Sequence, residues 1–455
     1  MNTAYALTQP SGAAVHVPAH ERVVLPNGIT LLVVPSPEVP LISFHAVFRG
    51  GPLGDSKPGV ASLVAGLLDK GAGSRNAFEF VDAVEGAGGS FSTVTGTEAL
   101  SISGQFLARD QSLMLELLSD AITRPRFEAE EFEKLRARRI ELIKATKDSD
   151  PAEVIGTYGR ATLFGSHPYG KPSTGSEESL ASIAHQDVLD YYRAHIGPDR
   201  LILVFAGDLD VGALRRDITE RLGHWRKAGT AAAAVAEPAC ARGRRVLLVD
   251  SPESAQTYFW IGNVGVNKRY VEHAALDLVN TLYGGRFTSM LNTELRIKSG
   301  LSYSARAGFT RTTAAGEFAI RSFTDTENTA TALDLSLETL TRLKTTGVTH
   351  DMLDSARSYV LGQYPLNFET AADWASALVE LEFYGLGPEY IDEYAAQLRR
   401  VTLPVARTVI DHAFPKADDL VIVLIGDAAK IREAASRYGE VTEMSLTQPS
   451  FSPSS

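Results

Sequence analysis

The stretch Asp199-Arg-Leu-Ile-Leu-Val-Phe-Ala-Gly-Asp208 returns later in the chain as Asp418-Asp-Leu-Val-Ile-Val-Leu-Ile-Gly-Asp427, at an offset of 219 residues. Each copy is typical of a buried strand that ends in Gly-Asp and follows a helix. A shorter echo sets residues 32–38 against residues 247–253, which both end in Ser-Pro-Glu, at an offset of 215 residues. Because the two echoes keep their order and nearly equal spacing, the sequence predicts an internal duplication of roughly 220 residues.

Strand and helix patterns mix within each copy. Residues 22–34 predict a β-hairpin whose Asn-Gly pair supplies the turn. Residues 42–48 and 100–106 alternate apolar and polar side chains, as half-buried antiparallel strands do. Because consecutive helices on an antiparallel sheet form an α+β layer, we expect an α+β protein with two tandem homologous domains, each an antiparallel sheet packed with helices. In the first copy the expected helices are 58–69, 76–85, 108–122, 129–147 and 152–163.

Changes in composition divide the chain into parts. Residues 21–227 hold the first copy and residues 244–443 hold the second. Between them, residues 228–243 have mostly small side chains interrupted by a proline, which is typical of an interdomain linker. Residues 1–20 read as a polar N-terminal arm. Residues 444–455, rich in serine and proline, are expected to be disordered.

The overall composition excludes several classes of function. The chain has 455 residues, too many for one ordinary domain, and 44% hydrophobic and 22% charged residues, as a soluble globular protein has. Its net charge of −11, without any dense basic run, disfavours a nucleic-acid role. Cys240 is the one cysteine, which excludes an intramolecular disulfide and a cysteine-based metal site. No apolar stretch is long enough to span a membrane.

Residues 59–71 read Gly-Val-Ala-Ser-Leu-Val-Ala-Gly-Leu-Leu-Asp-Lys-Gly and predict a buried apolar helix. The segment resembles the helix that carries H-x-x-E-H in the pitrilysin, insulinase and mitochondrial processing peptidase family, the inverted zincins. In this alignment the two zinc-binding histidines fall on Ser62 and Gly66, and the catalytic glutamate falls on Ala65. A serine hydroxyl is a poor zinc ligand, and alanine and glycine have no donor. The resemblance therefore implies that the helix stays in the core while this chain holds no zinc and cleaves no peptide alone.

The family's third zinc ligand is a glutamate in a later helix. Here that helix is predicted within residues 129–147, and a count back from Pro151 places the ligand position on Ile143, within one or two residues. Glu141 falls inside that range, so both positions stay open. One carboxylate without the histidines would not hold zinc.

Residues 280–303 resemble a segment of the family's second domain that supplies residues to a zinc site in another subunit. The resemblance implies that Tyr303 donates a hydrogen bond to the oxygen of the scissile carbonyl as it gains negative charge, and that Arg296 positions the substrate main chain. It also implies substrate contact at Gly284 and Gly285. Taken without this context, the same pair reads as a surface arginine and a packed tyrosine.

The sequence thus predicts the non-catalytic subunit of a heterodimeric zinc metalloendopeptidase. A homologous subunit bearing H-x-x-E-H would hold the zinc, this chain would need no cofactor of its own, and the substrates would be peptides or unfolded proteins. The alternative is a structural or binding subunit of the core-protein type, which would not need Arg296 and Tyr303.

The resemblance also suggests a compartment. Half-length bacterial members of this family are commonly secreted or periplasmic, so we expect the periplasm, with the cytoplasm as the alternative. The start of the given sequence has neither the basic nor the apolar region of a signal peptide.

Overall fold

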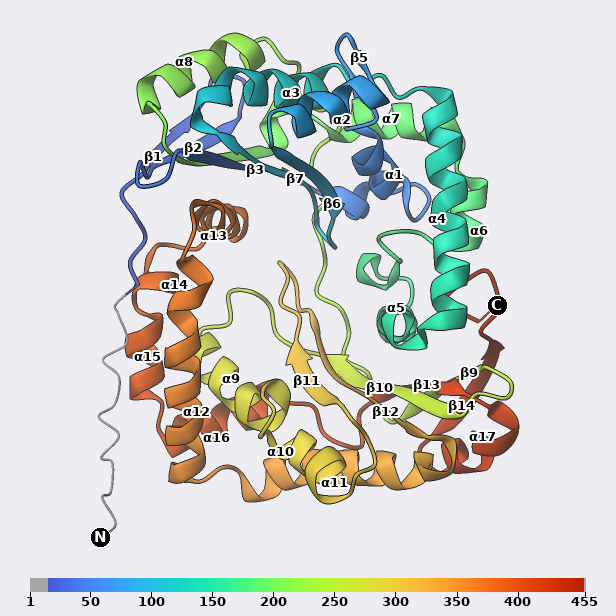
Figure 1. Ribbon diagram of the computed structural model, residues 1–455. Helices are drawn as coiled ribbons and strands as arrows, with labels where there is room; N and C mark the ends of the chain where they lie inside the picture. The colour runs from blue at the N-terminus through green and yellow to red at the C-terminus, as the bar shows by residue number, and fades with distance from the viewer. Residues whose placement is uncertain (1–14, 454–455) are drawn as a thin grey trace.

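A computed structural model describes residues 15–453 of the protein. It contains two six-stranded sheets, one in each half of the chain (Figure 1). The N-terminal sheet has the order β1-β2-β8-β3-β7-β6 and the C-terminal sheet has the order β11-β12-β10-β13-β9-β14. The strands are β1 Glu21–Val24, β2 Thr30–Pro35, β3 Leu41–Arg49, β6 Ser90–Thr95, β7 Ala99–Leu107, β8 Leu201–Gly207, β9 Arg245–Asp250, β10 Gln256–Val264, β11 Ala305–Phe309, β12 Glu317–Asp325, β13 Val421–Gly426 and β14 Glu440–Ser445, with a small hairpin of β4 Gly71–Ala72 and β5 Arg75–Asn76.

The order of strands confirms the internal duplication. The run β2-β8-β3-β7-β6 matches the run β9-β13-β10-β12-β11 strand for strand. The echoing segments pair with each other at equivalent points, because Pro35 lies opposite Gly207 in one half and Asp250 lies opposite Gly426 in the other. The two sheets differ in the sixth strand, since β1 runs antiparallel to β2 whereas β14 runs parallel to β9.

The sheets are mostly antiparallel, as expected, and each also contains parallel pairing that the sequence did not indicate. The pairs β2–β8, β9–β13 and β9–β14 are parallel. Each of these pairs joins strands separated by helices, and a parallel pair needs such a long crossover connection. Alternation within a single strand does not reveal this pairing, since it reports only which faces are buried.

The helices of the first half begin and end close to the predicted residues. They are α1 Val60–Leu67, α2 Ala77–Gly86, α3 Gln111–Thr123, α4 Ala129–Ser149, α5 Pro151–Phe164, α6 Glu177–Ser182, α7 His185–His195 and α8 Val211–Leu222. The second half contains α9 His273–Asn280, α10 Met290–Asn292, α11 Thr329–Thr346, α12 His350–Gln363, α13 Ala371–Tyr384, α14 Glu389–Asp392, α15 Tyr394–Arg400, α16 Leu403–Ala413 and α17 Ala428–Ser436. No helix in residues 15–453 is long and apolar enough to cross a membrane.

Each half lends one helix to the sheet of the other half. Helix α5 packs on β10 and β13 of the C-terminal sheet, and α13 packs on β3 and β8 of the N-terminal sheet (Figure 1). The contact of α5 requires Gly159, because a Cβ at that position would lie 2.5 Å from the ring of Trp260. Both sheets are therefore covered on two faces, and the two copies are interlocked rather than joined only by their linker.

The linker and the N-terminal arm lie outside the two copies and differ in their contacts. Residues 228–243 form no helix or strand. Most of the predicted arm lies outside the described residues, although the Val17 N–H donates to Asp392 Oδ1 at 2.7 Å. That bond places the end of the arm against the second half of the chain.

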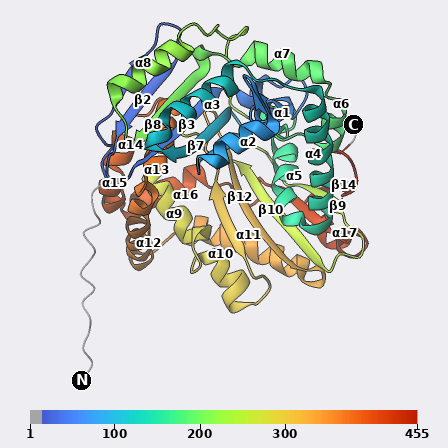
Figure 2. The same ribbon diagram turned by 45° about the horizontal axis from the view of Figure 1, so that its top comes forward.

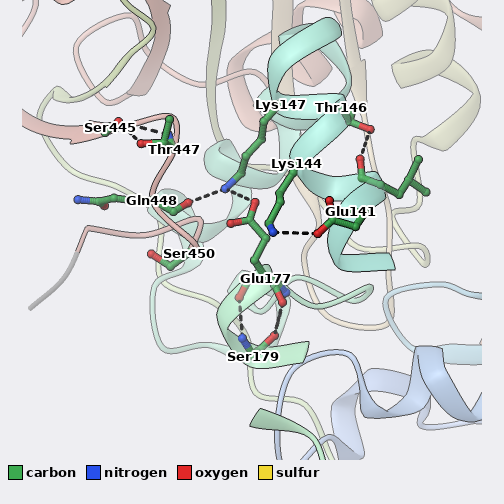
Figure 3. Close-up of polar contacts among 12 residues, drawn as sticks. Glu141, Lys144, Thr146, Lys147, Glu177, Ser179, Ser445, Thr447, Gln448 and Ser450 are labelled. Carbon is green, nitrogen blue, oxygen red and sulfur yellow. Dashed lines mark hydrogen bonds and ion pairs between the residues drawn. The ribbon is translucent and has the colours of Figure 1, made fainter. Parts of the chain in front are cut away.

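The expected disorder of residues 444–455 is wrong for the part that the structure describes. After β14, residues 446–453 form a C-terminal strap that crosses to the first half of the chain (Figure 3). Lys147 Nζ donates to the Gln448 carbonyl at 2.6 Å and pairs with Glu177 at 3.1 Å. Phe451 is buried against Tyr158, with ring centroids 5.0 Å apart. The serine- and proline-rich composition of this segment gives no indication of these few contacts.

Candidate functional site

Helix α1 is the frame of the degenerate zinc motif. It starts after Gly59, whose φ of 101° is left-handed. The carboxylate of Asp55 accepts hydrogen bonds from the backbone N–H groups of Gly59 at 2.9 Å and Ala61 at 2.8 Å. Burial raises the pKa of Asp55 to about 7. Ser62 and Ala65 are buried, so the helix serves as core packing, as the sequence predicts.

A guanidinium group lies across the two histidine positions of this motif. Arg139, from α4, donates through Nη1 to the hydroxyl of Ser62. A Cβ on Gly66 would lie 2.5 Å from Nη2 of the same arginine and 3.0 Å from Leu135 Cδ2. Burial lowers the pKa of Arg139 to about 10, against the opposing charge of Asp69. The guanidinium of Arg139 therefore occupies the space beside positions 62 and 66.

The third ligand position adds no metal ligand. Ile143 lies one helical turn beyond Arg139 and packs against the N-terminal core. Glu141 is exposed and pairs with Lys144 at 2.9 Å (Figure 3). Across residues 15–453, no group of three or more His, Cys, Asp or Glu side chains could hold a metal ion. The residues around α1 do not fit a zinc ion.

The glycine pair of the second half lies beside an edge strand. Gly284 is buried within a π-helical segment, Thr281–Gly285, and a Cβ there would lie 2.5 Å from the backbone nitrogen of Ala307 in β11. Gly285 is exposed. Gly284 is therefore needed for the close approach of this segment to the sheet, whatever else it contacts.

Arg296 and Tyr303 both project from the surface of the second half. Arg296 stacks over the ring of Phe287, with its guanidinium carbon 4.7 Å from the ring centroid. Tyr303 is 78% exposed. Within residues 15–453, neither the Arg296 side chain nor the Tyr303 hydroxyl forms a hydrogen bond or an ion pair. Their exposure leaves both groups free to act on something outside this chain.

The structure does not bring this pair to the degenerate motif. Helix α10, which lies in the same segment as Arg296, and α1 lie in opposite halves of the molecule in both views (Figures 1 and 2). Arg139 is the site residue that the sequence analysis missed. The sequence gives no signal that singles it out, because charged residues occur all along α4 and only the packing of α4 on α1 shows which of them faces the motif.

Two family models match consecutive parts of the chain. The model described as Insulinase (Peptidase family M16) matches residues 50–175, and the model described as Peptidase M16 inactive domain matches residues 182–360. The chain belongs to the peptidase M16 family. Because the residues at the metal positions do not fit zinc, it is a non-catalytic member of that family.

Individual relatives agree over most of their length. An uncharacterized zinc protease of Mycobacterium bovis is 25% identical over 401 residues, which cover 87% of this chain and 90% of the relative. The non-peptidase homolog YmxG of Helicobacter pylori is 24% identical over 398 residues, which cover 86% of this chain and 90% of the relative. A crystal structure of a peptidase M16 inactive domain from Pseudomonas fluorescens has a TM-score of 0.83 at 23% identity and covers 90% of this chain and 98% of that chain, which confirms the fold.

Proposed function

We propose that this M16 protein is the non-catalytic subunit of a heterodimeric zinc metalloendopeptidase. Its partner would be a homologous subunit that bears H-x-x-E-H and holds the zinc. The observation that carries the proposal is the pair Arg296 and Tyr303, which is exposed and makes no polar contact with its own chain in residues 15–453.

The chemistry of the two groups suits a site completed by another subunit. Peptide hydrolysis places negative charge on the carbonyl oxygen, and a preplaced hydroxyl such as that of Tyr303 stabilises it. A guanidinium such as that of Arg296 can bind a main-chain carbonyl and hold the substrate in line. The aromatic ring of Phe287 restrains the guanidinium by a cation–π contact, so less freedom is lost when substrate binds.

The substrates that fit this proposal are peptides and unfolded polypeptides. A pair of interlocked α+β halves would form one wall of an enclosure, and the partner would form the other. Folded proteins would be excluded by size.

The test is to co-express this chain with a zinc-bearing homologue and measure cleavage of a quenched fluorescent peptide. A 1:1 complex should form, and Tyr303→Phe should lower its kcat by about 10²–10³ while KM changes less. Tyr359→Phe is the matched control, because Tyr359 is another exposed tyrosine of the second half. An unchanged kcat for Tyr303→Phe, in a complex that forms normally, would favour the structural, core-protein type of role.

A further inference from the structure

A cavity of about 430 Å³ lies on the inner face of the C-terminal sheet, beside the start of α5. Helix α5 runs between the two sheets (Figure 1), so this cavity is on the side of the sheet that faces the other half of the molecule. Part of its wall is apolar and comes from Ile155, Tyr258 and Phe323. The rest of its wall includes Arg306, Arg321 and Glu317.

The two arginines of the cavity face each other across neighbouring strands. Arg306 on β11 lies directly opposite Arg321 on β12. Side chains that are directly opposite in an antiparallel pair lie on the same face, and like charges in such a pair repel each other. A repulsive pair at the wall of a cavity is stabilised when an anion lies between its members.

The protein itself neutralises only one of these two charges. Glu317, which is 2% exposed, accepts a hydrogen bond from Arg321 Nη2 through Oε1 at 3.0 Å. Its second oxygen makes no hydrogen bond, and a third arginine, Arg160, lies 3.7 Å from Oε1. No ion pair or hydrogen bond of the Arg306 guanidinium is formed within residues 15–453. Arg306 is thus the cation of the cavity that lacks a partner.

The surroundings leave the cavity with excess positive charge. The N-terminal end of α5, which carries the positive end of the helix dipole, lines the cavity at Ala152. Asp150, just before α5, is a second acid nearby. Burial chiefly, and then the charge of Asp150, raise the pKa of Tyr258. Among the residues that line the cavity, two arginines stand against one acid, Glu317.

We propose that this cavity binds a peptide carboxylate, held between Arg306 and Arg321, with an adjoining apolar side chain against Ile155, Tyr258 and Phe323. The proposal rests on the proposed function, because it names a feature of the peptides that the complex takes. The carboxylate comes either from the C-terminus of the peptide or from an aspartate or glutamate side chain.

Recognition by main-chain pairing is not available at this place. The edge of β11 is covered, because its Ala305 N–H donates to Asn292 Oδ1 at 3.3 Å and Gly284 packs against Ala307. A peptide therefore cannot extend the sheet along β11 without displacing this segment. Selection at the cavity depends on the charge of the ligand rather than on its backbone.

The experiment measures binding of labelled peptides to the isolated full chain by fluorescence anisotropy, without partner or zinc. Four unstructured peptides of one sequence are compared. They have a free C-terminal carboxylate or an amide, each with either Glu or Gln at one internal position. At least one carboxylate-bearing peptide should bind about tenfold or more tighter than the amide with Gln, and the pattern shows which carboxylate is used.

A second arm changes the protein. Arg306→Gln should weaken binding of the preferred peptide by about tenfold or more, Arg306→Lys should retain part of it, and Arg109→Gln, at an exposed arginine of the N-terminal half, should leave it unchanged. Equal affinity for all four peptides, or an unchanged affinity of a folded Arg306→Gln chain, overturns the proposal. So does competition by millimolar acetate as effective as that of the peptide. Because no turnover is measured, failure here is separate from failure of the Tyr303→Phe test.

Discussion

Rebuilding the zinc motif alone should not restore a zinc site, because Arg139 stands in its place. The variant Ser62→His, Ala65→Glu, Gly66→His and Ile143→Glu restores the two histidines and the catalytic glutamate. It also places a glutamate at Ile143, and the other candidate for the third ligand, Glu141, is already acidic. The Cβ of a side chain at position 66 would lie 2.5 Å from Arg139 Nη2. The new histidine and the guanidinium therefore cannot both fit. The hydrogen bond from Arg139 to Ser62 is lost in the same step.

Electrostatics adds to this steric conflict. A unit charge about 4 Å from a divalent ion, at an effective dielectric constant of about 20, opposes binding by about 8 kcal/mol. The binding free energy of zinc at structural sites is about 10–16 kcal/mol. Unless the guanidinium moves away, the repulsion therefore removes most of the available affinity.

The assay is zinc content by metal analysis, with affinity from competition against a chelating dye. The fourfold variant should retain well below one zinc per chain, and adding Arg139→Leu should raise it toward one. Arg139→Leu alone is the control and should bind none. Tight stoichiometric zinc in the fourfold variant would refute the role given to Arg139, and absence of zinc from the fivefold variant would refute the view that the frame of the site persists.

Two further predictions concern stability. Phe451→Ala should lower the free energy of unfolding by about 3 kcal/mol in urea titrations, because it empties the contact of the C-terminal strap with Tyr158; Phe287→Ala, at a residue that is 59% exposed, should change it little. Asp55 has a folded pKa of about 7, above its value of about 3.8 in the unfolded chain. Between these values the unfolded state loses its proton first, so the contribution of Asp55 to stability is full below about pH 3.8 and falls by up to about 4 kcal/mol as the pH rises to 7. Asp55→Asn should remove that part of the pH dependence, and parallel curves for the two proteins would contradict it.

Sequence patterns predicted where the helices and strands lie better than which elements pack against each other. The apolar run of α1 and the alternation in β3 and β7 report burial directly, so these elements appear where expected. The exchange of α5 and α13 between halves was not predicted, because periodicity shows how much of a helix is buried but not which sheet covers it. Helix α5 carried a signal all the same, since buried residues surround most of its circumference, as in a helix between two layers.

The absence of zinc-binding side chains could be predicted from the sequence, but the side chain that fills their space could not. Ser62, Ala65 and Gly66 cannot bind zinc in any conformation, so the loss could be stated from the sequence alone. That Arg139 fills the space follows only from how α4 packs on α1.

The interlocked halves explain how the fold is kept without the zinc ligands. Helix α1 is buried, and α4 leads directly into α5, which covers the sheet of the other half. The frame of the degenerate motif is therefore one that the second half also needs for its own core. A buried polar gap at that place would be unfavourable, and Arg139 with Ser62 fills it with a hydrogen-bonded pair. Under the proposed function, the groups that act on substrate are therefore exposed ones such as Tyr303 rather than those packed around α1.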